Sequence, residues 1–302
     1  MSIEESSEYA DARADVILFE SDWWMHDPEV VDLCRRIPGL RSGLSAVRAE
    51  TGRVDTGNVY ALVNDYPQWP ADWRSCRRPV HDQLLGDRRS GRGLLGKKPL
   101  KPMAFITLGL PGSGKTGVLR QEAWNYYRST ISARDRKRDI EGYPAGAAVL
   151  DADEVRGRLP EFQGGIGSGV VQLETASLTY GPIKDRLFKS AHSAVVYDTV
   201  GDPNYIVKEV ALLAEQGFAV SVLLAKLPTE LAVERAVARF LETGRFVPPE
   251  YIRGREGVPE SALEAVRASS IPLEGWGIWD TTCRPADHVD GAGIFAPVQM
   301  GS

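Results

Sequence analysis

A glycine-rich turn that follows a short apolar run constrains this chain more than any other feature. The run Met103–Leu108 (MAFITL) is typical of a buried strand, and residues 109–116 after it read GLPGSGKT. They match the pattern G-x-x-x-x-G-K-[ST] at every fixed position. Glycines at these places let the main chain curl so that its N–H groups converge, and a following helix adds its positive N-terminal end. The segment is therefore predicted to be a phosphate-binding loop.

The loop defines a set of expected nucleotide contacts. Lys115 is expected to reach the β- and γ-phosphates, and the Thr116 hydroxyl is expected to ligate Mg²⁺. The residues predicted to bind the nucleotide are Gly109, Pro111, Gly112, Ser113, Gly114, Lys115 and Thr116.

Apolar segments alternate with helical patterns after this loop. Further strands are expected at 147–150, 194–197, 218–225 and 276–280, and helices at about 115–131, 176–191, 204–216, 229–243 and 258–269. Such alternation implies a parallel sheet covered on both faces. We expect an α/β fold, a P-loop NTPase/kinase-like three-layer α/β/α arrangement with a mainly parallel sheet of about five strands and an N-terminal extension.

Composition divides the chain and excludes several classes of protein. The net charge of -5 argues against a protein that is basic overall and coats nucleic acid. The three cysteines lie far apart without a CxxC pair, which fits a reducing cytoplasm rather than a disulfide framework or a zinc site. The N-terminus is acidic and polar, unlike a signal peptide. The most apolar stretch, Phe218–Ala225, is too short to span a membrane.

Three regions follow from these shifts in composition. Residues 1–85 form an extension, residues 86–102 a basic Gly- and Pro-containing linker, and residues 103–302 the P-loop domain. The extension carries four tryptophans, which are Trp23, Trp24, Trp69 and Trp73. We interpret them as packing residues, with a surface for a substrate or partner as the alternative.

Acidic residues follow two of the expected strands. Asp151 and Asp153 come directly after 147–150, and Asp198 ends the next strand. In an α/β sheet the carboxyl ends of strands beside the phosphate loop face the ligand. A carboxylate there can take the proton from a hydroxyl that attacks the γ-phosphorus, and Asp198 can hold Mg²⁺ directly or through water. The alternative is that these acids only cap helices.

Arginines gather in a later segment. Arg235 and Arg239 are four residues apart on one helical face, and Arg245 follows after a glycine. Guanidinium groups that converge from a lid near 239–250 suit neutralisation of a transferring phosphoryl group. A solvated helix with ordinary surface charge is the alternative. Together with the acids, these residues favour an ATP-dependent kinase that uses Mg²⁺.

Three other functions have weaker support in the sequence. Asp198–Gly201 has the D-x-x-G form of GTPases, but no N-K-x-D guanine reader occurs anywhere in the chain. A nucleic-acid kinase rests only on the basic linker, and such runs are usually just solvated, so a nucleic-acid substrate is not expected. A non-enzymatic ATP-binding switch or interaction protein would not need a catalytic base.

The ordered set GLPGSGKT, DADEVR, VVYDT and RAVARFLETGRFVPPEYI resembles the zeta-toxin family of P-loop kinases over roughly residues 103–256. Members phosphorylate UDP-N-acetylglucosamine at a sugar hydroxyl. The resemblance implies that Lys115 and Thr116 handle ATP and Mg²⁺, that Asp153 is the general base, and that Arg239 and Arg245 surround the transferred phosphate. The catalytic set is then Asp153, Lys115, Arg239 and Arg245, the substrate set is Asp151, Arg156 and Asp198, and the metal set is Thr116 and Asp198.

The resemblance leaves the acceptor and the partner open. Gly181-Pro182 interrupts a helix that helps to shape the sugar pocket in the toxins, and the loop 164–169 is a substrate loop or a linker. The acceptor is therefore a nucleotide sugar, or alternatively a dinucleotide such as NAD, a nucleoside or an antibiotic. Toxins of this family are silenced by an antitoxin that blocks the ATP site, so an antitoxin protein is an expected partner. The extension could inhibit in the same way within the chain, or it could complete a substrate pocket.

Overall fold

The computed structural model describes residues 3–63, 80–81, 101–137, 144, 146–189, 194–283 and 286–295. Trp69, Trp73 and residues 86–100 of the expected linker lie outside these ranges. By the contacts within it, the chain divides into two compact units. The N-terminal unit comprises Met1–Arg88, Ala152–Asp185 and Val237–Val247, and the phosphate-loop unit comprises Arg89–Asp151, Arg186–Ala236 and Pro248–Ser302. The helices of the extension thus group with two segments from the region expected to form the P-loop domain.

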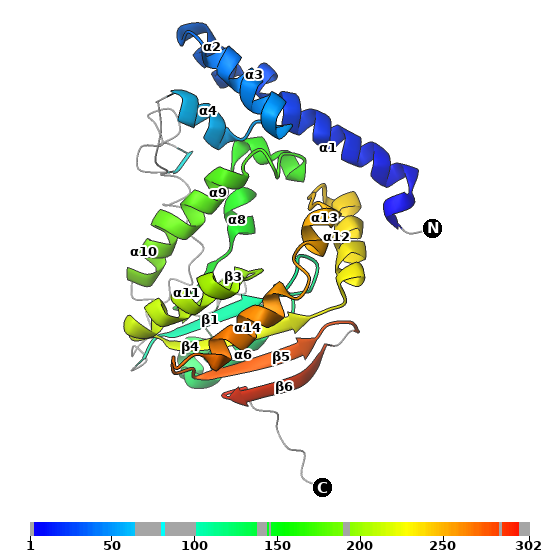
Figure 1. The fold of residues 1–302 in the computed structure, drawn as a ribbon. Helices are drawn as coiled ribbons and strands as arrows, with labels where there is room; N and C mark the ends of the chain where they lie inside the picture. The colour runs from blue at the N-terminus through cyan, green and yellow to red at the C-terminus, as the bar shows by residue number, and fades with distance from the viewer. Residues whose placement is uncertain are drawn as a thin grey trace. The chain divides into compact units, whose positions relative to one another are not determined.

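The phosphate-loop unit is built on one sheet of six strands (Figure 1). The strands are β1 (Met103–Leu108), β2 (Ala147–Leu150), β3 (Ala194–Thr199), β4 (Ala219–Lys226), β5 (Gly275–Asp280) and β6 (Asp287–Gly293). They run in the order β2-β3-β1-β4-β5-β6, and every pair is parallel except β5 with β6. This arrangement confirms the predicted α/β class with a mainly parallel sheet. The sixth strand was not expected.

Helices cover both faces of this sheet, as the sequence predicts. On one face α6 (Leu119–Thr130) packs Leu119, Trp124 and Tyr127 against Phe105 and Val196 of the strands. On the other face lie α11 (Pro203–Glu215) and α14 (Val258–Ala268), which contact each other and β4 (Figure 1). Strand residues alternate between the faces, and both faces are apolar because both are buried.

The remaining helices of this unit are short or shared. They are α7 (Ala133–Arg136), the C-terminal part of α10 (Lys184–Lys189), the first half of α12 (Thr229–Thr243) and α13 (Pro249–Arg253). Within the described residues, the helices are too short or too polar to cross a lipid bilayer.

The N-terminal unit is helical. Its elements are η1 (Ile3–Glu5), α1 (Ser7–His26), α2 (Pro28–Arg36), α3 (Leu40–Thr51), α4 (Thr56–Val63), α8 (Ala152–Arg156), η2 (Pro160–Gly165), α9 (Gln172–Leu178) and η3 (Thr179–Ile183). Ser6 caps α1 and Asp27 caps α2 through side-chain oxygens that accept main-chain N–H groups. Trp23 and Trp24 are 5% and 2% exposed, which supports their interpretation as packing residues.

The helix expected at 176–191 is interrupted. Residues Thr179–Ile183 form a π-helical turn between α9 and α10, and Gly181 departs from helical geometry inside it. The cause is Pro182, whose ring excludes the normal hydrogen bond of a helix interior.

Candidate active site

The glycines of the phosphate loop are required by their backbone and by a close neighbour. Gly112 and Gly114 have φ of 86° and 85°, a left-handed conformation that side chains disfavour. A Cβ on Gly112 would lie 2.5 Å from the carbonyl oxygen of Ala232 at the start of α12. Among the described residues, no protein acceptor is found for the main-chain N–H groups of Gly112, Gly114 and Thr116. The loop therefore offers a cradle of unused donors, which suits phosphate oxygens.

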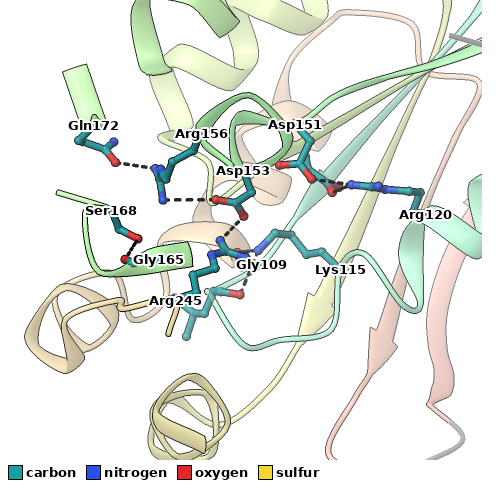
Figure 2. Close-up of polar contacts among 12 residues, drawn as sticks. Gly109, Lys115, Arg120, Asp151, Asp153, Arg156, Gly165, Ser168, Gln172 and Arg245 are labelled. Carbon is teal, nitrogen blue, oxygen red and sulfur yellow. Dashed lines mark hydrogen bonds and ion pairs between the residues drawn. The ribbon is translucent and has the colours of Figure 1, made fainter. Parts of the chain in front are cut away.

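Lys115 and Thr116 follow this cradle before the helix begins. The Lys115 ammonium donates to the carbonyls of Gly109 at 2.7 Å and Leu110 at 3.0 Å (Figure 2). Thr116 is exposed. The helix expected from about residue 115 starts at Leu119, because residues 115–118 form wider turns in which the Arg120 N–H bonds to the Lys115 carbonyl, five residues back.

Arg120 binds two of the acids that the sequence singled out. Its Nη2 lies 2.7 Å from Oδ2 of Asp151 and 2.6 Å from Oδ2 of Asp198. Figure 2 shows the first of these ion pairs. The Thr107 hydroxyl donates to the other oxygen of Asp198. The three charged side chains are 10%, 11% and 6% exposed, so the ends of β2 and β3 are joined by a buried ion-pair cluster, here called the Arg120 clamp.

Arg120 was not predicted as a site residue, although its sequence context carries a signal. Arg120 shares a helix face with Ala123, Trp124 and Tyr127, all of which are apolar and buried. A lone arginine on an apolar stripe requires a carboxylate partner inside the fold. The alternative interpretation of Asp198 as a helix cap finds no support, since the cap of α11 is Asp202, which accepts from the Tyr205 N–H at 3.1 Å.

A second charged cluster lies in the N-terminal unit. The Asp153 carboxylate pairs with Nη2 of Arg245 through one oxygen and with Nη1 of Arg156, 3.3 Å away, through the other. Arg156 also donates to Oε1 of Gln172 at 2.5 Å. Figure 2 shows these three contacts as one chain of side chains. Asp153 remains 39% exposed, which leaves the carboxylate open to a further group.

Arg239 belongs to the same cluster, and two of its nitrogen atoms have no acceptor among the described residues. Within the described part of the chain, its buried Nε and Nη2 atoms have no hydrogen-bond partner. Burial lowers the pKa of this guanidinium, the positive charge of Arg245 lowers it further, and Asp153 opposes the change. A buried cation with two unused donors is suited to an incoming anion. Arg235, by contrast, donates to the Thr282 carbonyl at 2.9 Å.

The structure thus gathers the predicted residues into two sets. The phosphate-loop unit holds residues 109–116 with Asp151 and Asp198, and the N-terminal unit holds Asp153, Arg156, Arg239 and Arg245. The two sets are joined covalently between Asp151 and Asp153.

The residues present fit ATP and Mg²⁺. The glycine cradle has unused N–H donors, and Mg²⁺ needs only one or two protein oxygens because it keeps several waters. Each Asp198 oxygen retains a lone pair beyond its bond to Thr107 or Arg120, so a water-mediated contact remains available. Among the described residues, no group of three or more His, Cys, Asp or Glu side chains is placed to hold a metal ion.

Several solved structures share this fold. The complex of AvrRxo1-ORF1 with AvrRxo1-ORF2 containing sulphate ions matches with a TM-score of 0.59 and 18% identity, over 80% of this chain and 78% of that one. The same complex with ATP matches with a TM-score of 0.54 and 20% identity, over 80% and 78%. A structure from the PezAT chromosomal toxin-antitoxin system of Streptococcus pneumoniae matches with a TM-score of 0.49 and 16% identity, over 73% of this chain and 83% of that one. No curated protein sequence matches this chain.

The sequence profile of the family described as Zeta toxin matches residues 93–271. This range contains the phosphate loop, the Arg120 clamp and the cluster around Asp153. It covers more than half of the 302 residues, and the chain therefore belongs to the zeta toxin family.

Proposed function

We propose that this protein is an ATP-dependent kinase that transfers the γ-phosphate to a hydroxyl group of a small molecule. The observation that carries the proposal is Arg239, a partly buried cation whose buried Nε and Nη2 have no acceptor among the described residues, in the same cluster as Asp153. A cation prepared for an anion, next to a carboxylate that can accept a proton, is what phosphoryl transfer to a hydroxyl requires.

Each residue then has a defined task. The N–H groups of residues 112–116 and the Lys115 ammonium bind the β- and γ-phosphates, and Lys115 exchanges its carbonyl acceptors for phosphate oxygens. Asp153 accepts the proton of the attacking hydroxyl. Arg239 and Arg245 hold the charge that develops on the transferred group.

The Arg120 clamp and Arg156 position these groups. Arg120 holds Asp151 and Asp198 at the ends of two adjacent strands, and Arg156 and Arg245 each hold one oxygen of Asp153. Thr116 and, through water, Asp198 would hold Mg²⁺, which would supply positive charge to offset that of the phosphates.

The acceptor we favour is UDP-N-acetylglucosamine or a related nucleotide sugar, because the chain belongs to the zeta toxin family. NAD, a nucleoside and an antibiotic remain the alternative acceptors. An antitoxin protein is the proposed partner, supported by membership of the zeta toxin family and by a structural neighbour described as a two-protein complex. ATP as the phosphate donor fits a cytoplasmic location, which we also propose.

A screen for transfer tests the proposal. Purified protein is incubated with ATP, Mg²⁺ and one candidate acceptor at a time: UDP-N-acetylglucosamine, NAD, and a panel of nucleosides and antibiotics. The masses of the products are measured by mass spectrometry. A gain of one phosphate on one compound supports the proposal and names the acceptor. ATP that binds to the protein without transfer to any compound favours the binding switch instead.

A further inference from the structure

The N-terminal helices are bonded to the segment 169–174, which lies far from them in sequence. The Glu20 carboxylate on α1 accepts the Gly169 N–H at 2.7 Å. The Asp55 carboxylate accepts the Leu173 N–H at 3.0 Å. The Thr56 N–H, at the start of α4, donates to the Val170 carbonyl at 2.8 Å. Three main-chain groups of one short segment are therefore held by the N-terminal helices.

A buried carboxylate strengthens this attachment. Glu174 is fully buried and accepts from the Thr56 hydroxyl at 2.8 Å. Its other oxygen lies 2.8 Å from Nε2 of His81. A buried carboxylate is costly unless its bonds are kept, so these partners cannot separate without a large loss of stability. The attachment is therefore rigid rather than a loose surface contact.

The opposite side of the same segment leads to Asp153. Gln172, between Val170 and Leu173 in the chain, accepts from Arg156, and Arg156 pairs with Asp153 (Figure 2). The segment is thus bonded on one side to the N-terminal helices and on the other to the proposed base.

The turn that carries Arg245 rests on the neighbouring loop. A Cβ on Gly165 would collide with the Gly244 carbonyl, and a Cβ on Gly244 would lie 2.8 Å from the Gly164 carbonyl. Gln163, just before these glycines, has a φ of 42°, which is unusual for a side-chain-bearing residue. Two main chains in such close contact move together. The loop at Gly164 and Gly165, which leads to Gln172, therefore also supports Arg245.

An aromatic contact reaches the same turn from α1. The Tyr9 ring lies edge-on to Phe240 at 6.1 Å between centroids, and Phe240 packs on Phe246 at 5.1 Å. These phenylalanines flank Arg245 in the sequence, so α1 is linked through Phe240 to the segment that carries Arg245.

We infer that the N-terminal helices position the phosphotransfer residues, with Glu20 and Gln172 as positioning residues that act through the segment 164–174 on Asp153 and Arg245. The inference rests on the proposed function. It stands against one of the roles that the sequence leaves open for the extension, inhibition within the chain, because a part that holds the catalytic residues in place is needed for turnover, whereas an inhibitor in the same chain opposes it.

Positioning and inhibition predict opposite changes in kcat when the contacts are weakened. Gln172→Ala removes the acceptor of Arg156 at an exposed position, where the fold does not depend on the side chain. Leu173→Ala is the matched control, since Leu173 is the next residue of the helix and is 48% exposed. Glu20→Ala removes the Gly169 acceptor, and Glu20→Gln retains an oxygen that can accept the same N–H.

The experiment measures kcat, the KM values for ATP and acceptor, and hydrogen exchange of peptides that cover 164–174 and 243–246. We expect Gln172→Ala and Glu20→Ala to lower kcat by about tenfold to a hundredfold, the cost of small misplacements of reacting groups. The KM for ATP stays unchanged, Glu20→Gln recovers most of the activity, and Leu173→Ala behaves as wild type. Glu20→Ala also speeds exchange in 164–174 and 243–246.

Unchanged or increased kcat in both alanine variants overturns the positioning role, and an increase supports inhibition by the extension. Wild-type protein that phosphorylates no acceptor refutes the proposed function. In that case the exchange data still test the attachment, and unaltered exchange of 164–174 in Glu20→Ala refutes it.

Discussion

Replacing Arg120 by methionine should destabilise the protein strongly, because two buried carboxylates then lose their counterion. Asp151 and Asp198 are 11% and 6% exposed, and both bond the same Nη2 atom of Arg120. Methionine keeps much of the side-chain volume and lacks the charge, so the loss reports on electrostatics rather than on a cavity.

The magnitude follows from the geometry of the clamp. Removing one partner of a buried ion pair costs about 3–5 kcal/mol. Because Arg120 neutralises two carboxylates, the upper part of this range is expected. At about 2–4 °C per kcal/mol for domains of 150–250 residues, a loss of about 4–5 kcal/mol should lower the melting temperature by roughly 8–20 °C.

Thermal melts followed by circular dichroism measure this loss, and a double variant provides the control. Asp198→Asn removes one of the two charges, so Arg120→Met with Asp198→Asn should recover part of the loss relative to Arg120→Met alone. Independent residues would instead give additive changes in stability. Additivity, or an Arg120→Met melting temperature close to that of wild type, would refute the clamp as a source of stability.

Three further predictions concern the loop, the cluster and the N-terminal unit. Gly112→Ala should abolish ATP binding measured by calorimetry, because its Cβ meets the Ala232 carbonyl, whereas Gly217→Ala, with the same φ of 86° but open space around it, should retain binding. Arg239→Met should lose phosphate transfer yet melt at the same or a higher temperature, because it removes a buried cation whose Nε and Nη2 have no acceptor; a large fall in melting temperature would contradict this. Burial raises the pKa of Asp55 from 3.8 to about 7. The folded state therefore holds a proton that the unfolded state has released, and this group should lower stability by about 1.4 kcal/mol per pH unit between about pH 4 and pH 7, with no further change above that range. Denaturant unfolding of Asp55→Asn at several pH values should show this slope reduced, and an unchanged slope would exclude Asp55 as its source.

Local patterns in the sequence predicted the elements that carry their own signal. The phosphate loop is defined by its glycines and its lysine, and β2 and α12 were expected at the residues where they occur. Each depends on side chains close together in the chain, so periodicity and turn chemistry are sufficient to identify it.

Features that depend on distant partners were not predicted. The bond between Glu20 and Gly169 joins residues 149 positions apart, and neither residue carries a local sign of the other. Arg120 was read as part of an ordinary helix, because its carboxylates follow 31 and 78 residues later. Strand β6 was missed for a different reason. Its sequence, DHVDGAG, is polar and glycine-rich and lies at the sheet edge, so no apolar alternation marks it.

Transfer of the γ-phosphate by three proteins side by side tests the central claim most directly. Wild type, Lys115→Ala and Asp153→Asn are given ATP, Mg²⁺ and the acceptor found in the screen, and ATP binding and phosphorylated product are both measured. We predict that wild type transfers phosphate, that Lys115→Ala loses both binding and transfer, and that Asp153→Asn binds ATP normally while its transfer rate falls by about 10²–10⁴-fold, the usual contribution of a general base. Transfer at the wild-type rate by folded Asp153→Asn would contradict the account.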